Sequence, residues 1–132
     1  VKSPLYGVPN APRQIYHPSQ ENFLENDDKE ELVEIPPLTN RILSCYNLPV
    51  AGGFYFRALP YFFISQGIKK FNYNNRPAML YFHPKDLDEN MPKIKEYSWH
   101  YYYGKRNILT KFKKLLGDFE FTSAQDFLGF KN

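Results

Sequence analysis

The sequence has almost no cysteine and no long apolar run. Its 132 residues include one cysteine, Cys45, so no disulfide can form within them, and a disulfide scaffold is excluded. No stretch reaches the roughly 18 consecutive apolar residues of a transmembrane helix. The first residues, "VKSPLYGVP", lack the charged, apolar and small-residue order of a signal peptide. We expect a soluble cytoplasmic chain without a transmembrane segment, with the membrane or the periplasm as alternatives.

Strong charge of one sign is also missing. The chain has 17 basic and 14 acidic residues, a formal net charge of +3, and no basic arm or stripe. Nucleic acid is therefore not an expected partner. The length suits one domain with a real core, spanning residues 1–132.

Aromatic residues are abundant instead. They make up 18% of the chain, with 11 tyrosines and 12 phenylalanines. Large rings bury much apolar area, and their faces also suit the apolar faces of sugars. Composition alone leaves both uses open.

The chain divides into an irregular beginning and a patterned remainder. Prolines and acidic residues dominate 1–31, which predicts an irregular arm and an acidic loop. Residues 32–128 read as the α/β portion. Their first element, "LVEI" at 32–35, predicts a short edge strand, because Pro36 and Pro37 end any ladder.

Two amphipathic helices follow from apolar spacing. The first has apolar residues on one face and lysines near its end, where cations suit the helix dipole. The second has apolar residues at i, i+4, i+7 and i+8, and Gly117 predicts its stop. The residues that define them are Tyr61, Ile64, Ile68 and Phe71 for the first, and Ile108, Phe112, Leu115 and Leu116 for the second.

Strands alternate with these helices. Five consecutive apolar residues, 78–82, predict a strand covered on both sides, as in a parallel sheet. The "DFEF" stretch at 118–121 predicts a final strand, and Ser123 with Asp126 predicts a helix cap. The alternation indicates an α/β fold with parallel pairing.

His83 stands at the carboxyl end of the 78–82 run. In parallel α/β folds ligands meet the protein at the carboxyl ends of strands. Histidine is a natural general acid or base near neutral pH. A histidine that only caps the sheet is an equally good interpretation of this position.

Two aromatic stretches offer further candidates. Gly52 and Gly53 allow a tight turn or a close approach before Tyr55 and Arg57, which could contact sugar hydroxyls. Alternatively, Arg57 pairs with a carboxylate and locks the loop. Trp99 and the tyrosines at 101–103 form either a glycan platform or an aromatic cluster under a long loop, and the roles of Asp86 and Asp88 stay open.

Four stretches together resemble a known family. They are "LYGVPNAPR", "NLPVAGGFYFRALPY", "RPAMLYFHPKDLD" and "KFKKLLGDFEFTSAQDFL", which extend over nearly all of residues 5–128. In order and spacing they are similar to the C-terminal portion of NodB-homology polysaccharide deacetylases, which are carbohydrate esterases, in the branch linked to exopolysaccharide synthesis.

The resemblance implies a fold and a reaction. The fold would be part of an irregular (β/α) barrel, of which this chain holds the C-terminal strands and helices. The reaction would be metal-assisted hydrolysis, usually with zinc, of the N-acetyl groups on a polysaccharide of N-acetylated amino sugars. "LYFHP" resembles the motif of the last barrel strand, which would make His83 the catalytic acid. Tyr55, Arg57, Tyr81 and Trp99 would contact substrate, although Tyr81 departs from the leucine usual in that motif.

The metal and base motifs of that family are not found in this sequence. His17, His83 and His100 lack metal-ligand spacing, so we expect no metal bound by this chain alone. We expect the chain to complete its site with an upstream deacetylase half and to be inactive without it. A non-catalytic carbohydrate-binding domain and a protein-interaction module, for example a homodimer, are the alternatives.

Overall fold

The computed structural model describes residues 11–42 and 46–129. Cys45, and residues 5–10 of the first stretch quoted above, lie outside the described residues. No described helix has both the length and the apolar character needed to cross a membrane.

A small hairpin stands at the edge of the fold. Strands β1 (Thr39–Ile42) and β2 (Tyr46–Pro49) pair antiparallel, with Thr39 opposite Pro49. The pairing continues beyond the strands, because the Val50 N–H donates to the Leu38 carbonyl at 3.1 Å. The hairpin brings the chain back to the start of the first helix, so it sets where that helix begins.

The segment 78–82 runs along this hairpin in extended form. The Met79 carbonyl accepts the Leu38 N–H at 2.9 Å, and the Tyr81 N–H donates to the Ala51 carbonyl at 3.0 Å. Both contacts belong to isolated parallel bridges rather than to a ladder. The segment therefore connects the two sides of the hairpin base and ends at His83.

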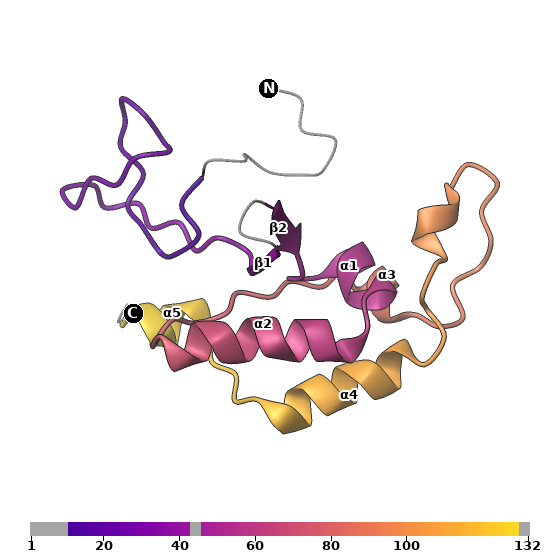
Figure 1. Cartoon of the computed structure of the whole chain (residues 1–132). Helices are drawn as coiled ribbons and strands as arrows, with labels where there is room; N and C mark the ends of the chain where they lie inside the picture. Colours follow the sequence, from indigo (N-terminus) through magenta and orange to yellow (C-terminus); the bar gives the residue numbers. More distant parts are fainter. Residues whose placement is uncertain (1–10, 43–45, 130–132) are drawn as a thin grey trace.

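Helices make up most of the regular structure. α2 lies at the centre, with α4 along one side of it and the hairpin on the other (Figure 1). The bounds are α1 (Gly53–Ala58), α2 (Tyr61–Tyr73), α3 (Pro84–Leu87), the 3-10 turn η1 (Trp99–Tyr101), α4 (Ile108–Asp118) and α5 (Ala124–Leu128). Helices and a small sheet together agree with the predicted α/β class. The predicted parallel pairing is wrong for the described sheet, which is antiparallel; parallel pairing is limited to two isolated bridges among the described residues.

The core gathers between α1, α2, α4 and the hairpin base. The Phe82 ring meets those of Phe56 and Phe112 edge to face, with centroids 4.8 and 5.0 Å apart. This geometry suits the quadrupoles of aromatic rings. The buried apolar residues of the cluster are Leu38, Val50, Ala51, Phe56, Ile64, Ile68, Ile108 and Leu115.

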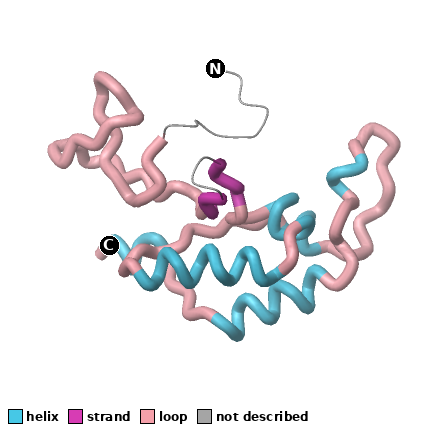
Figure 2. Tube along the Cα trace, in the orientation of Figure 1, coloured by secondary structure: helices cyan, strands magenta, loops and turns pink. Residues whose placement is uncertain are grey.

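Two long loops project from opposite sides of this core (Figure 2). Residues 11–38 lie on one side, where Tyr16 with Glu34, and Pro18 with Asn26, form isolated antiparallel bridges. Residues 88–107, which include η1, lie on the other side, next to α1 and α3. The second loop carries most of the aromatic candidates.

Both predicted amphipathic helices are confirmed. Ile64 and Ile68 of α2, and Ile108 and Leu115 of α4, are buried. The predicted cap is confirmed as well: Ser123 precedes α5, and its Oγ accepts the Asp126 N–H at 3.1 Å. The predicted stop at Gly117 is wrong, because α4 continues to Asp118.

The strand predictions need three corrections. Residues 32–35 form only the single bridge at Glu34, because the prolines that follow remove ladder donors. Residues 118–121 form no strand: Asp118 ends α4, and the residues after it have no partner strand among the described residues. Residues 78–82 are covered on one face only, with Met79 and Tyr81 36% and 47% exposed.

Candidate functional site

Gly52 and Tyr81 fix the end of the extended segment. The two residues form a parallel bridge, and a Cβ at Gly52 would lie 1.7 Å from the Tyr81 carbonyl oxygen. The close approach predicted for the paired glycines is thus present. Because Tyr81 is held there, the chain reaches His83 only two residues after its bridge to Gly52.

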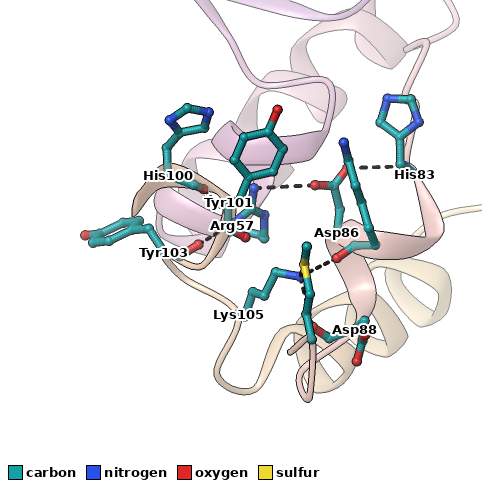
Figure 3. Close-up of polar contacts among 10 residues, drawn as sticks. Arg57, His83, Asp86, Asp88, His100, Tyr101, Tyr103 and Lys105 are labelled. Atoms are coloured by element: carbon teal, nitrogen blue, oxygen red, sulfur yellow. Dashed lines mark hydrogen bonds and ion pairs between the residues drawn. The ribbon is translucent and has the colours of Figure 1, made fainter. Parts of the chain in front are cut away.

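His83 is the last residue before α3 and is exposed. Its N–H donates to Asp86 Oδ2 at 3.3 Å, and its carbonyl accepts the Asp86 N–H at 2.8 Å. Its ring lies near that of Tyr81, with centroids 6.2 Å apart and an interplanar angle of 78°. The backbone is held while the imidazole points away from Asp86 (Figure 3).

Arg57 lies between α3 and residues 88–107, which we call the aromatic loop. Its Nη1 donates to the carbonyl oxygens of His100 at 3.1 Å, Tyr101 at 3.1 Å and Tyr103 at 2.6 Å. Its Nη2 pairs with Asp86 Oδ1 at 3.4 Å. Burial lowers the pKa of the guanidinium, and the charge of Asp86 acts in the opposite direction. The alternative in which Arg57 pairs with a carboxylate is therefore the one observed.

Asp86 joins three parts of the chain. One carboxylate oxygen pairs with Arg57 and the other accepts the His83 N–H, and the side chain is 7% exposed. A Cβ at Gly53, where φ is +51°, would lie 3.5 Å from the same carboxylate. Glycine at this position lets α1 start against α3 without strain.

Lys105 closes the loop onto α3. Its amine donates to the carbonyl oxygens of Lys85 and Asp88, the latter at 3.1 Å, and lies 3.0 Å from Met91 Sδ. Burial lowers the pKa of this amine, and the nearby Arg57 charge lowers it further. Both ends of the 88–105 loop are therefore tied to one place.

Rings gather over α1 in what we call the aromatic cluster: Phe54, Tyr55, Trp99, His100 and Tyr103. Phe54 is its centre, with T-shaped contacts to Tyr55, Trp99 and His100 at centroid distances of 5.6, 6.0 and 6.3 Å. The Trp99 and Tyr103 rings meet at 87°, with centroids 5.7 Å apart, and are 67% and 52% exposed. They form a solvent-facing corner of two rings.

No group of three or more His, Cys, Asp or Glu side chains in the described part of the chain is arranged to hold a metal ion. His17 Nδ1 donates to the Glu30 carbonyl oxygen at 2.6 Å, inside the N-terminal arm. His100 belongs to the aromatic cluster and lies 4.6 Å from the Tyr101 ring. Within residues 11–42 and 46–129, the side chains therefore do not fit a metal centre.

With this geometry in place, the comparisons give one match. A family model described as Domain of unknown function (DUF3473) matches residues 1–129. The chain belongs to this family. Neither a curated protein nor a solved structure matches it.

The residues singled out in this DUF3473 domain fall into two groups. Tyr81 and His83 lie together at the end of the extended segment. Tyr55, Arg57 and Trp99 belong to α1 and the aromatic loop, where Tyr55 contacts Phe54 and the Arg57 guanidinium lies beneath the loop. Asp86 connects the groups through Arg57 and the His83 backbone.

Sequence reasoning missed Phe54 and Lys105, and it left Asp86 open. Phe54 follows the glycine pair directly, and this position at the start of a helix was its only signal. Lys105 follows Gly104, whose φ of +71° marks a tight turn, but nothing in a single sequence shows that the amine is buried. Contacts between residues far apart in sequence decided both roles.

A groove of about 150 Å³ lies elsewhere in the domain. It runs between α2, residues 77–80 and residues 119–127, and its lining is mostly apolar. None of the five residues singled out as site residues lines it. The groove and the candidate site are therefore separate features.

Proposed function

We propose that this chain is the C-terminal part of a metal-dependent polysaccharide N-deacetylase that acts in exopolysaccharide synthesis. It would contribute the end of an irregular (β/α) barrel and one face of the site. The observation that carries the proposal is the exposed His83 at the carboxyl end of the parallel-bridged segment, which Asp86 and Arg57 connect to the loop of the solvent-facing aromatic cluster. The resemblance supports it, as does the occurrence of this domain at the C-terminus of polysaccharide deacetylases.

His83 would act as the general acid. Water gives a proton to the catalytic base of the upstream half as it adds to the acetyl carbon of the N-acetyl group, and the resulting tetrahedral intermediate then breaks its C–N bond. The leaving nitrogen takes a proton from the His83 imidazolium, which releases the free amine and acetate. An exposed ring on a backbone fixed by Asp86 and Tyr81 suits a group that must reach a substrate nitrogen.

Zinc would supply the polarising charge in the complete enzyme. The described residues offer no cluster to hold it, so we assign no ligand and no metal-dependent step to this chain. The ligands and the catalytic base would come from an upstream deacetylase half.

The substrate contacts would come from exposed and half-buried rings. Trp99 and Tyr103 offer a corner on which one sugar ring stacks on one face and meets the other edge-on. Tyr55 lies beside Phe54 under this corner, and Tyr81 lies next to His83. Arg57 would act indirectly, because its guanidinium binds carbonyl oxygens of the loop that carries Trp99 and Tyr103.

A second function is a carbohydrate-binding domain without chemistry of its own. The exposed Trp99 and Tyr103 rings favour it, because they would bind a glycan whether or not His83 meets an acetamido group. Sugar binding without turnover, with the upstream half present, would decide for this alternative.

The test is deacetylation of a chitin oligosaccharide with added zinc. The chain alone is compared with the gene product extended upstream, and each is also prepared as His83→Ala. His17→Ala is the matched control, since His17 lies in the N-terminal arm. We expect activity in the extended form only, and a loss of about 10²- to 10⁴-fold with His83→Ala.

Unchanged activity in the His83→Ala enzyme would remove His83 from the reaction. Absence of activity on all acetylated glycans tried, with binding retained, would replace the proposal by the carbohydrate-binding alternative.

A further inference from the structure

We propose that Arg57 and Asp86 are a positioning pair that holds the aromatic cluster at a fixed place relative to His83. The contacts of the pair are given by the geometry alone, whereas the role that we assign to them rests on the proposed function. It concerns two buried side chains that bind groups of the domain itself, and it adds a coupling between the two groups of site residues.

A continuous set of contacts joins the two groups (Figure 3). The His83 N–H donates to one oxygen of Asp86 at 3.3 Å, and the other oxygen pairs with Arg57 Nη2 at 3.4 Å. Arg57 Nη1 then holds the carbonyl oxygens of residues 100, 101 and 103. One guanidinium thus contacts α3 on one side and the aromatic loop on the other.

Gly104 adds a second fixing point to the same place. A Cβ there would lie 2.6 Å from the Arg57 carbonyl oxygen, and its φ is +71°. The loop therefore passes against the backbone of α1 at the residue whose side chain binds it. Side chain and main chain of Arg57 fix the turn together.

A contribution to folding stability does not by itself explain why this ion pair is present. The two side chains are 4% and 7% exposed, and Arg57 Nε has no hydrogen-bond partner among the described residues. Buried ion pairs are often no more stabilising than apolar residues of similar volume. What an arginine fork supplies is direction, because its planar donors fix several acceptors at once.

Fixed direction matters to a polymer substrate. One sugar unit on the Trp99–Tyr103 corner would set where the acetamido group of another unit meets His83. The aromatic loop projects from the core. Without contacts that hold it, the loop would move, and the distance between the Trp99–Tyr103 corner and His83 would vary. Misplacement by about 1 Å can cost a hundredfold in rate.

Trp99 is the only tryptophan in the chain, so its fluorescence reports on the aromatic loop alone. The test compares Arg57→Lys and Asp86→Asn with Arg106→Lys, an exposed arginine at the end of the same loop. In each folded variant we measure Trp99 anisotropy and the NMR resonance of the His83 ring. The pair predicts that Arg57→Lys and Asp86→Asn each lower the anisotropy and shift His83, whereas Arg106→Lys changes neither.

Kinetics of the extended gene product give the second readout. Arg57→Lys should raise KM and lower kcat, each by about tenfold, because the aromatic cluster and His83 would no longer be held at a fixed relative position. Trp99→Ala should raise KM alone, and His83→Ala should lower kcat alone. This split is not expected from a general loss of folded protein, which lowers kcat without raising KM.

Unchanged Trp99 anisotropy and His83 resonance in folded Arg57→Lys and Asp86→Asn would overturn the pair. If either single variant does not fold, the double variant Arg57→Met, Asp86→Leu keeps an uncharged interior and takes its place. Failure of the proposed function would appear differently, as no turnover by the unchanged enzyme, and the two spectroscopic readouts would still decide the inference.

Discussion

The backbones of Gly52 and Tyr81 touch at the point where α1 begins. A Cβ at Gly52 would lie 1.7 Å from the Tyr81 carbonyl oxygen and 2.9 Å from its carbonyl carbon. The φ of Gly52 is 172°, extended backbone that any residue adopts, so the constraint is steric only. Glycine is required there by the neighbouring extended segment and not by the turn.

Gly52→Ala should therefore destabilise the fold. Overpacking against backbone typically costs about 1–3 kcal/mol, because the segment that leads to His83 must move. Gly117→Ala is the matched control: it lies within α4 with nothing within 4 Å of its added Cβ. There alanine should stabilise by about 0.5–1 kcal/mol. Urea unfolding of both variants measures the opposite signs, and a neutral Gly52→Ala would contradict the close approach.

Lys111 caps the end of α1 from α4. Its amine donates to the carbonyl oxygens of Phe56 and Leu59 and lies 5.1 Å from the Phe56 ring centroid, and burial lowers its pKa. Lys111→Met keeps an apolar chain of similar length but removes the donors. We expect a loss of about 1–3 kcal/mol of unfolding free energy, because two carbonyls lose their partner.

The control for that substitution is Lys113→Met on the exposed face of α4. It should change stability by less than about 0.5 kcal/mol. Equal urea midpoints for the two variants would mean that the α1 carbonyls do not need Lys111.

Asp118 gives the fold a dependence on acidic pH. The Tyr61 hydroxyl donates to its Oδ2 at 2.8 Å, and this bond, followed by that from Lys114, lowers the pKa of Asp118. A carboxyl whose pKa is lower in the folded state stabilises the fold above its unfolded pKa of about 3.9. That contribution disappears as pH falls through the folded value.

Asp118→Asn should therefore reduce the loss of stability on acidification. Urea midpoints measured at about pH 5 and pH 3 should fall further in the unchanged chain than in this variant. Tyr61→Phe should remove most of the same difference, whereas Glu120→Gln, an exposed carboxyl nearby, should keep it. A variant that follows the unchanged chain at both pH values would show that the pair adds nothing to stability.

The sequence predicted the helices because their signal is periodic and local. Ile64, Ile68, Ile108 and Leu115 are spaced to share a helix face, and all four are buried. It did not predict the β1–β2 hairpin, because "TNRI" and "YNLP" are short, polar and without alternation. It predicted too much burial for residues 78–82, because a run of five apolar residues has the same pattern whether one face of the segment or both faces are covered.

The sequence indicated which residues to consider for the candidate site, but not the contacts that join them. Position at a strand end indicated His83, and the glycine pair indicated a close approach near Tyr55 and Arg57. The pairing of Arg57 with Asp86 depends on how α1, α3 and the loop meet in space, and no local pattern encodes that. Burial of Lys105 and the central place of Phe54 follow from the same tertiary contacts.

Trp99 tests whether the aromatic cluster binds sugar. The ring is 67% exposed, so Trp99→Ala should leave the fold intact while it removes one wall of the corner formed with Tyr103. We expect the Kd for a chitin oligosaccharide, measured by titration calorimetry, to rise about tenfold, which corresponds to about 1.4 kcal/mol. Tyr73→Ala, an 89% exposed ring at the end of α2, is the control and should leave Kd unchanged. Equal affinity in both variants would assign the exposed rings to contacts other than sugar, because a stacked pyranose cannot lose its platform without losing binding energy.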